Sequence, residues 1–251
     1  MLSWPVSPGA SGAISALLGA WAALHFFGFL FGRVNADGTS RTFPPAKMAA
    51  SAALVLCAAV FWLDGARGTF LAPFSALICF GMFFGFLGDL TLAGFLRLPQ
   101  QVMFGMLWFG IGHILYILGF GFLALGLFGV AVTTESIVAV LVWMVIAAVI
   151  WRVLVASPKT PPVLNYGALG YGLLLGAMTG VATGLALQHA AFIGTAIGAA
   201  LFLLSDMILG NVMFRENRFP LAHDLIWLLY IVGQLFIVFT NAVALRLIAG
   251  L

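Results

Sequence analysis

Residues 136–156 have the sequence SIVAVLVWMVIAAVIWRVLVA, in which Arg152 is the one charged residue among 21. A helix needs about 20 mostly apolar residues to cross the hydrocarbon core of a bilayer, so this stretch predicts a transmembrane helix. The whole chain has the same character. Of its 251 residues, 64% are hydrophobic and only 7% are charged, whereas soluble domains carry roughly 25% charged residues. We therefore expect an integral membrane protein.

Further apolar stretches lie on both sides of this one and bring the number of predicted spans to eight. Their approximate limits are 11–32, 47–63, 70–96, 100–126, 136–156, 165–187, 190–213 and 222–249. Turn-forming and charged residues separate them, least clearly between Leu127 and Glu135. The predicted fold is an all-α polytopic membrane bundle, with residues 1–251 forming a single integral-membrane helical domain.

The positive charges are distributed unevenly over the predicted loops. The odd-numbered loops and the adjoining span ends hold eight of the ten Lys and Arg residues, namely Arg33, Arg41, Lys47, Arg97, Arg152, Lys159, Arg215 and Arg218. Arg67 and Arg246 lie on the opposite side. Since short cytoplasmic loops are enriched in Lys and Arg, we expect the odd loops in the cytoplasm and both termini outside, with a bacterial inner membrane as the expected location. The scattered charges form no basic stripe, which argues against a nucleic-acid partner.

Two short patterns concern helix arrangement. The sequence LGDLTL at 87–92 resembles LSDMIL at 204–209, and each is followed by a basic, proline-containing loop and a span with a Tyr-Ile pair. Four spans separate the copies, so they suggest a weak 4+4 parallel repeat. In the sixth span, glycine recurs every fourth residue, at Gly172, Gly176, Gly180 and Gly184. Such stripes let helix backbones approach closely, so we interpret this one as a packing face.

Two acidic residues lie inside apolar spans, Asp89 in the third and Asp206 in the seventh. A charge at the bilayer centre costs at least about 2.5–3.5 kcal/mol on insertion scales, and intramembrane acids are usually functional. The structural alternative is an ion pair with Arg97 or Arg215. The two aspartates are therefore the first candidates for a functional site.

Other polar side chains share helix faces near these acids. His113 and Tyr116 lie three residues apart in the fourth span, and Tyr230 and Gln234 lie four apart in the eighth. Both spacings place the pair on one helix face. If the spans alternate as predicted, these groups lie at depths similar to those of the aspartates. We expect polar groups from four helices to converge on one cavity.

Taken together, these residues resemble the YhhN-like lysoplasmalogenase family of membrane proteins. The resemblance rests on two signatures. The first consists of Gly88-Asp89 with Leu92, Phe104, Phe109, His113 and Tyr116, and the second of Ser205-Asp206, Tyr230 and Gln234. Lys47 resembles the basic residue that opens the family's second span. The similarity extends over most of the chain from about Lys47 onward.

The resemblance implies hydrolysis of the vinyl-ether bond of lysoplasmalogens to a fatty aldehyde and a glycerophospho-headgroup compound. Protonating the β-carbon of an enol ether leaves an oxocarbenium ion that water captures. Asp89 and Asp206 would divide the acid and base roles as the two carboxylates of a glycosidase do. His113 and Tyr116 would orient them, Tyr230 and Gln234 would support them, and Lys47 or Arg97 would meet the lipid phosphate. The implied partners are a lysophospholipid and the bilayer, with no cofactor and no metal.

Three other functions stay open on the sequence. Paired intramembrane aspartates also occur in aspartyl proteases that cut peptides within the membrane. A metal-dependent hydrolase would require ligands from the set Asp89, His113, Asp206, His223 and Asp224. A proton-coupled transporter of lipids or small molecules would use one aspartate as a proton relay. The sequence does not predict an oligomeric state.

Overall fold

The computed structural model describes residues 4–250 and contains eight helices long and apolar enough to span a membrane. They are α1 (Pro8–Phe31), α2 (Pro44–Val60), α3 (Ala72–Leu92), α4 (Gln101–Phe128), α5 (Thr134–Ile150), α6 (Pro162–Gln188), α7 (Ile193–Phe214) and α8 (Ala222–Ala249). Two π-helical segments, η1 (Phe61–Ala66) and η2 (Trp151–Val155), continue α2 and α5, and a short 3-10 helix, η3 (Ala190–Phe192), precedes α7. Residues 4–250 contain no strand. The predicted all-α, eight-span bundle is confirmed.

Proline begins several of these helices. Pro8, Pro44 and Pro162 occupy the first positions of α1, α2 and α6. Proline suits this position because its fixed φ is already helical and its missing N–H would have no partner within the helix. The side chain of Ser7 also caps α1 by accepting a hydrogen bond from the amide of Ala10.

The third span ends earlier than the sequence suggested. We expected it to continue to residue 96, but α3 ends at Leu92. Gly94 adopts a positive φ of 78°, and the amide of Phe95 bonds back to the carbonyl of Leu90 at 2.9 Å. This is the usual way in which a glycine ends a helix. Asp89 therefore lies within one turn of the end of its helix.

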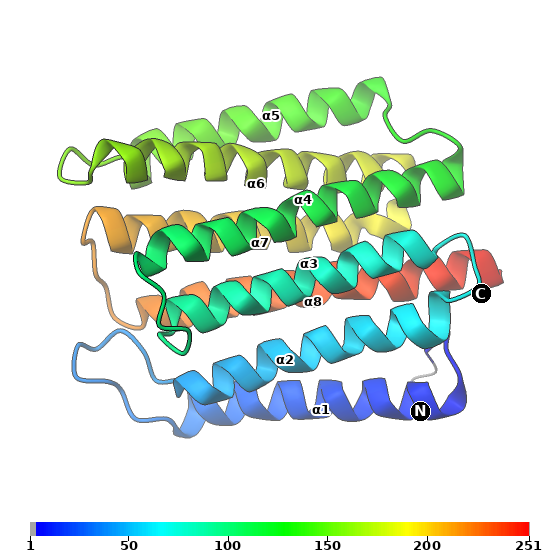
Figure 1. The fold of residues 1–251 in the computed structure, drawn as a ribbon, viewed down its shortest axis with the longest axis horizontal. Coiled ribbons are helices and arrows are strands. Elements are labelled where there is room, and N and C mark those ends of the chain that lie inside the picture. Colours follow the sequence, from blue (N-terminus) through cyan, green and yellow to red (C-terminus); the bar gives the residue numbers. More distant parts are fainter. Residues whose placement is uncertain (1–3, 251) are drawn as a thin grey trace.

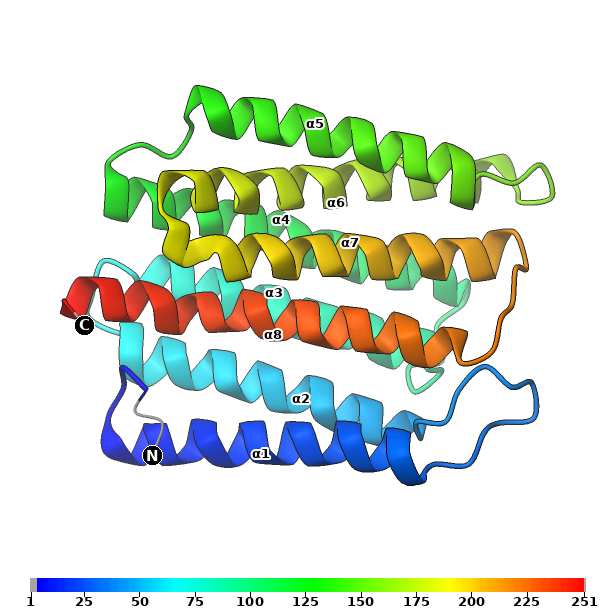
Figure 2. The ribbon, with the colours of Figure 1, turned by 180° about the vertical axis from the view of Figure 1, so that it is seen from behind.

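Consecutive helices pair as hairpins, and the hairpins pack side by side (Figure 1). Helices α1 and α5 lie at opposite edges of the bundle in both views (Figures 1 and 2), and only 11% of their most apolar segments is buried. The most buried span is α8, at 61%. Helix α8 therefore lies in the interior of the bundle, whereas the two edge helices present apolar faces outward.

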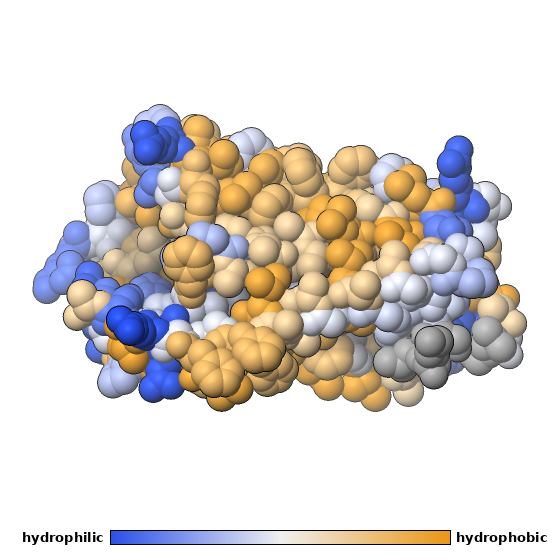
Figure 3. Space-filling view, turned by 90° about the horizontal axis from the view of Figure 1, so that it is seen from below, coloured by the Kyte–Doolittle hydropathy of each residue, from blue (hydrophilic) through white to orange (hydrophobic). Residues whose placement is uncertain are grey.

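The α1–α2, α3–α4, α5–α6 and α7–α8 connections all lie at one end of the bundle, which we call the basic end (Figure 1). The first residues of α1 and the last residues of α8 lie toward the opposite end. Apolar side chains cover the middle of the surface, and hydrophilic ones gather at the two ends (Figure 3). This pattern fits a multi-pass membrane protein, while the predicted orientation and the internal repeat stay predictions.

Three glycines of the α6 stripe, Gly176, Gly180 and Gly184, pack against α5, and Gly172 packs against Met207 of α7. A Cβ atom added at Gly176 would lie 2.8 Å from the carbonyl oxygen of Trp143 and 3.0 Å from Cα of Met144. One added at Gly184 would lie 2.7 Å from Cβ of Ser136. These contacts leave no space for a side chain, so the predicted packing face is confirmed. The opposite side of α6 is left to face α4 and α7.

Candidate functional site

Asp89 is held by hydroxyl groups from two other helices. Its side chain is buried, with 6% of the residue exposed. Its Oδ2 accepts a hydrogen bond from Oγ of Ser51 on α2 at 2.6 Å and one from the hydroxyl of Tyr230 on α8 at 2.9 Å. Tyr230 is among the site residues predicted from the sequence, whereas Ser51, a small residue among the alanines of its span, is not.

A chain of hydrogen bonds continues from Tyr230 into the bundle. Nε2 of Gln234 donates to the Tyr230 hydroxyl at 3.4 Å, and Oε1 of Gln234 accepts from the hydroxyl of Tyr116 at 2.7 Å. Gly85 makes space for this chain, because an added Cβ would lie 3.0 Å from Nε2 of Gln234. Buried polar groups are costly unless they are hydrogen-bonded, so this chain orients Tyr230 and, through it, Asp89.

Asp206 has a different set of supports. The hydroxyl of Tyr171 on α6 donates to Oδ2 of Asp206, and the same hydroxyl lies 3.2 Å from Nε2 of His113 on α4. Because the tyrosine proton points to the aspartate, the imidazole is the donor in the second contact. His113 therefore meets Asp206 through Tyr171, and not directly.

Tyr171 is not among the site residues predicted from the sequence. It lies between Gly170 and Gly172, in a span whose glycine stripe already had a packing explanation. The available signal was its depth. A tyrosine well inside an apolar span must place its hydroxyl against a partner, and no loop lies near enough to provide one.

The largest polar recess at the site opens at the basic end. We call this cavity of about 370 Å³ the polar cavity. Both aspartates line it, together with Tyr230 and Lys47. His113, Tyr116 and Gln234 do not line it, so the expectation that all the polar groups converge on one cavity is wrong. They are 0–1% exposed and lie behind the residues that do.

Lys47 and Asp224 tie the first loop to the cavity wall. Nζ of Lys47 lies 3.4 Å from Oδ1 of Asp224 and 3.2 Å from Oγ of Ser40. Asp224 also accepts bonds from the amides of Arg41, at 2.5 Å, and Thr42, at 3.2 Å. These contacts account for the burial of Asp224 on α8, so no chemical role is needed to explain it. They also occupy the ammonium group that the sequence analysis assigned to the lipid phosphate.

The alternative of ion pairs at the two site aspartates is wrong. Arg215 donates to backbone oxygens, with Ala156 O at 2.8 Å. Within residues 4–250, the Lys47–Asp224 pair is the one salt bridge between side chains.

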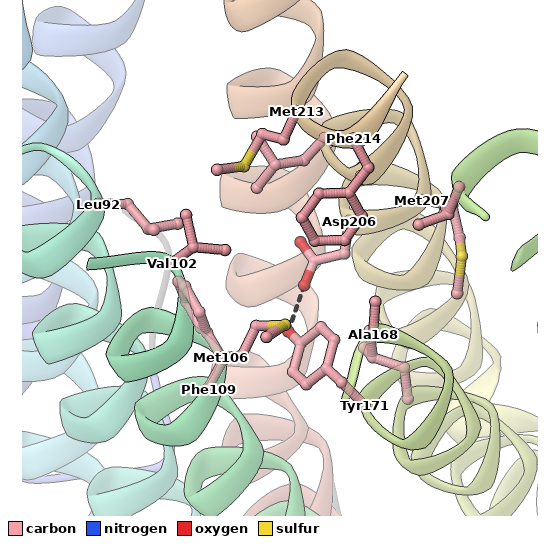
Figure 4. Close-up of a pocket in the computed structure, with 14 residues that line it drawn as sticks. Leu92, Val102, Met106, Phe109, Ala168, Tyr171, Asp206, Met207, Met213 and Phe214 are labelled. Atoms are coloured by element: carbon pink, nitrogen blue, oxygen red, sulfur yellow. Dashed lines mark hydrogen bonds between the residues drawn. The ribbon is translucent and has the colours of Figure 1, made fainter. Parts of the chain in front are cut away.

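A second, smaller cavity adjoins the polar cavity at Asp206; Figure 4 shows the residues that line it. This apolar cavity has a volume of about 60 Å³ and is lined by hydrophobic residues apart from Asp206 and Tyr171. In Figure 4 the Tyr171 hydroxyl and the Asp206 carboxyl point toward each other, with Met106 and Phe109 on the α4 side. Asp206 lines both cavities, whereas Asp89 lines only the polar one.

The candidate metal ligands do not gather. Across residues 4–250, no three His, Cys, Asp or Glu side chains are placed to hold one ion. In particular, His223 and Asp224 on α8 contact the first loop, whereas His113 on α4 contacts Tyr171. The arrangement is one of two carboxyls with hydroxyl donors, which suits proton transfer.

Comparison with known proteins assigns the chain to a family. The YhhN family profile matches residues 43–241, most of the chain. The protein therefore belongs to the YhhN family, as the resemblance of its aspartate motifs suggested. No curated protein and no solved structure gives a significant match.

Proposed function

We propose that this protein is a membrane-embedded hydrolase that cleaves the vinyl-ether bond of lysoplasmalogens. The observation that carries the proposal is the pair Asp89 and Asp206, which come from different helices and line one cavity that opens at the basic end. Membership of the YhhN family supports the lipid substrate. Two buried carboxyls with separate supports are what carbon protonation followed by water addition requires.

The position of each acid suggests its role. Asp206 lies between the polar and apolar cavities, so it is the carboxyl that an apolar chain in the smaller cavity would pass. We assign it as the acid that protonates the β-carbon of the alkenyl chain. Its proton forms the new C–H bond, the double-bond electrons move, and the adjacent carbon becomes an oxocarbenium ion.

Asp89 lines the polar cavity and not the apolar one. We therefore assign it as the base. It removes a proton from water as the water oxygen bonds to the cationic carbon, giving a hemiacetal. The hemiacetal collapses when Asp206 takes the hydroxyl proton and Asp89 returns its proton to the leaving oxygen. The products are one aldehyde and one glycerol hydroxyl, and both carboxyls regain their starting protonation.

The surrounding residues position these two acids. Ser51 and Tyr230 fix the Asp89 carboxyl at 2.6 and 2.9 Å, and Tyr171 fixes Asp206 with His113 behind it. Fixed donors in a water-poor site stabilise developing charge without rearrangement. Lys47, which also lines the polar cavity, offsets the negative charge of Asp224.

The test is aldehyde release by purified protein in detergent. Wild-type protein should release a fatty aldehyde from a 1-alkenyl lysophospholipid without any transmembrane gradient. The Asp89→Asn/Asp206→Asn double variant, purified in parallel, should release none. A proton-coupled transporter would instead give no aldehyde and would catalyse counterflow in liposomes. That result would contradict the proposal that the protein is a hydrolase.

A further inference from the structure

A groove on the lipid-facing surface leads to the candidate site. It runs between α4 and α6 and has a volume of about 440 Å³. We call it the lateral groove. Its lining is apolar apart from Tyr171 and begins near the basic end, at Met103. In the view of Figure 1 no other helix lies in front of α4 and α6.

The groove and the apolar cavity share a wall. Met106 on α4 and Tyr171 on α6 line both, so the two spaces adjoin at these side chains. Methionine is unbranched and adapts its shape readily. The order of features from the lipid inward is therefore lateral groove, Met106 and Tyr171, apolar cavity, Asp206, polar cavity.

We infer that the lateral groove binds the alkenyl chain of the lysolipid, which enters sideways from the bilayer between α4 and α6. This inference rests on the proposed function and adds the chain-binding site and the route of the substrate. The headgroup then occupies the polar cavity, and the bond to be cleaved lies at Asp206, where the two environments meet.

The groove is long enough to hold a large part of one alkenyl chain. It extends on α4 from Met103 to Ile114, which is about 17 Å at 1.5 Å per residue. One leaflet contributes about half of the ~30 Å hydrocarbon core. A chain that leaves the leaflet sideways into this groove keeps the same depth and stays in apolar surroundings throughout. Such a path avoids exposing the chain to water.

Glycines form part of the groove and leave it open. An added Cβ would meet nothing within 4 Å at Gly170 and only Leu174, at 3.8 Å, at Gly110. These positions differ from Gly176, where an added Cβ would lie 2.8 Å from backbone. Helix packing therefore does not explain Gly110 and Gly170, whereas room for a ligand does. A large side chain at either position fills the groove without displacing a helix.

Groove-filling variants give the activity test. Gly110→Phe and Gly170→Phe should lower kcat/KM for a long-chain 1-alkenyl lysolipid by about ten- to a hundredfold, as expected when a few methylene contacts are lost. The same variants should lower kcat/KM much less for a short-chain alkenyl analogue, which makes few contacts along the groove. Gly121→Phe is the matched control, since Gly121 also lies on α4 with nothing within 4 Å but lines a separate recess toward α5. Unchanged long-chain kinetics in both groove variants would overturn the inference.

Photolabelling separates this inference from the proposed function. The probe is a saturated 1-alkyl lysophospholipid with a diazirine in its chain, which needs no turnover. It should crosslink to α4 and α6 at the groove, and a 1-alkenyl lysolipid should compete while a diacyl phospholipid should not. Equal competition by both lipids would mean ordinary boundary lipid and would overturn the inference. Specific labelling in a protein that releases no aldehyde would support the groove while refuting the hydrolase proposal.

Discussion

Tyr171 on α6 donates its phenolic proton to Asp206 on α7 and receives a contact from His113 on α4 at 3.2 Å. Three helices thus fix one carboxyl. Asp89 is fixed by α2 and α8 instead, so the two acids depend on different parts of the bundle. Tyr171 also lines the lateral groove, so the groove adjoins a residue that supports Asp206, whereas the residues that support Asp89 lie elsewhere.

Removing either site carboxyl should abolish turnover. Asp89→Asn and Asp206→Asn keep the shape of the side chain but can neither give nor take the required proton. We expect each to lose at least the 10²–10⁴-fold typical of one acid–base group, measured as aldehyde release. Both variants should elute from size exclusion as the wild type does. Asp37→Asn, in the exposed first loop, is the control and should keep full activity, whereas full activity in either site variant would exclude the two-carboxyl mechanism.

Tyr171 and His113 should act as one positioning unit. Tyr171→Phe and His113→Ala should each lower kcat and leave KM nearly unchanged, because phenylalanine keeps the ring that lines the groove and His113 lines neither the groove nor the two cavities. Their effects should not add in the double variant, since residues in one hydrogen-bonded network show coupling of about 0.5–3 kcal/mol. Tyr166→Phe, on an exposed part of the same helix, serves as the control. Additive losses would show that His113 acts independently of Tyr171.

The fold was predictable because each span satisfies its backbone hydrogen bonds internally and reveals itself by length and hydropathy. The end of α3 was harder, since Phe95 and Leu96 continue the apolar run after the turn at Gly94. The hydropathy of these residues reflects the surroundings of their side chains and does not show whether their backbone is helical. A glycine flanked by apolar residues gives no clear stop signal.

The candidate site was only partly predictable, for a reason of the same kind. Asp89 and Asp206 are conspicuous because a charge in an apolar span needs an explanation. Tyr171 and Ser51 are ordinary in composition and matter only through contacts between helices. The contact of Asp224 with Ser40 joins residues 184 apart in sequence, and no local spacing encodes it.

Asp224 should contribute to stability more than to chemistry. It accepts hydrogen bonds from Ser40, Arg41 and Thr42 and pairs with Lys47. Asp224→Ala leaves a buried ammonium without its partner, which typically costs about 3–5 kcal/mol. We expect a lower midpoint of thermal unfolding in detergent, with greater proteolysis of the first loop. Ser40→Ala should cost much less, and a wild-type midpoint for Asp224→Ala would contradict the anchoring role.

The loop charges predict which end faces the cytoplasm. Single cysteines at Ala36 and Lys159, both exposed at the basic end, should be protected from an impermeant thiol reagent in intact cells. One at Arg67, at the opposite end, should be labelled. The native Cys57 and Cys79 are buried and provide a low background. The reverse labelling pattern would invert the predicted orientation.

The bond that is cleaved provides the last prediction, because it separates carbon protonation from ester hydrolysis. Attack on an ester needs a nucleophile or metal-bound water together with oxyanion donors, and the sequence has no Gly-x-Ser-x-Gly motif to present a serine. A vinyl ether needs only a proton donor, a group that stabilises the cation, and water.

We therefore expect hydrolysis of 1-alkenyl lysolipids, little of 1-acyl lysolipids and none of saturated 1-alkyl ethers, which cannot form an oxocarbenium ion by protonation at carbon. The alkenyl reaction should also slow in deuterium oxide, because transfer of the Asp206 proton to carbon is the expected slow step. Chromatography of the products in both solvents measures these rates. Equal rates on acyl and alkenyl substrates, or the absence of a solvent isotope effect, would show that Asp206 does not act by protonating carbon.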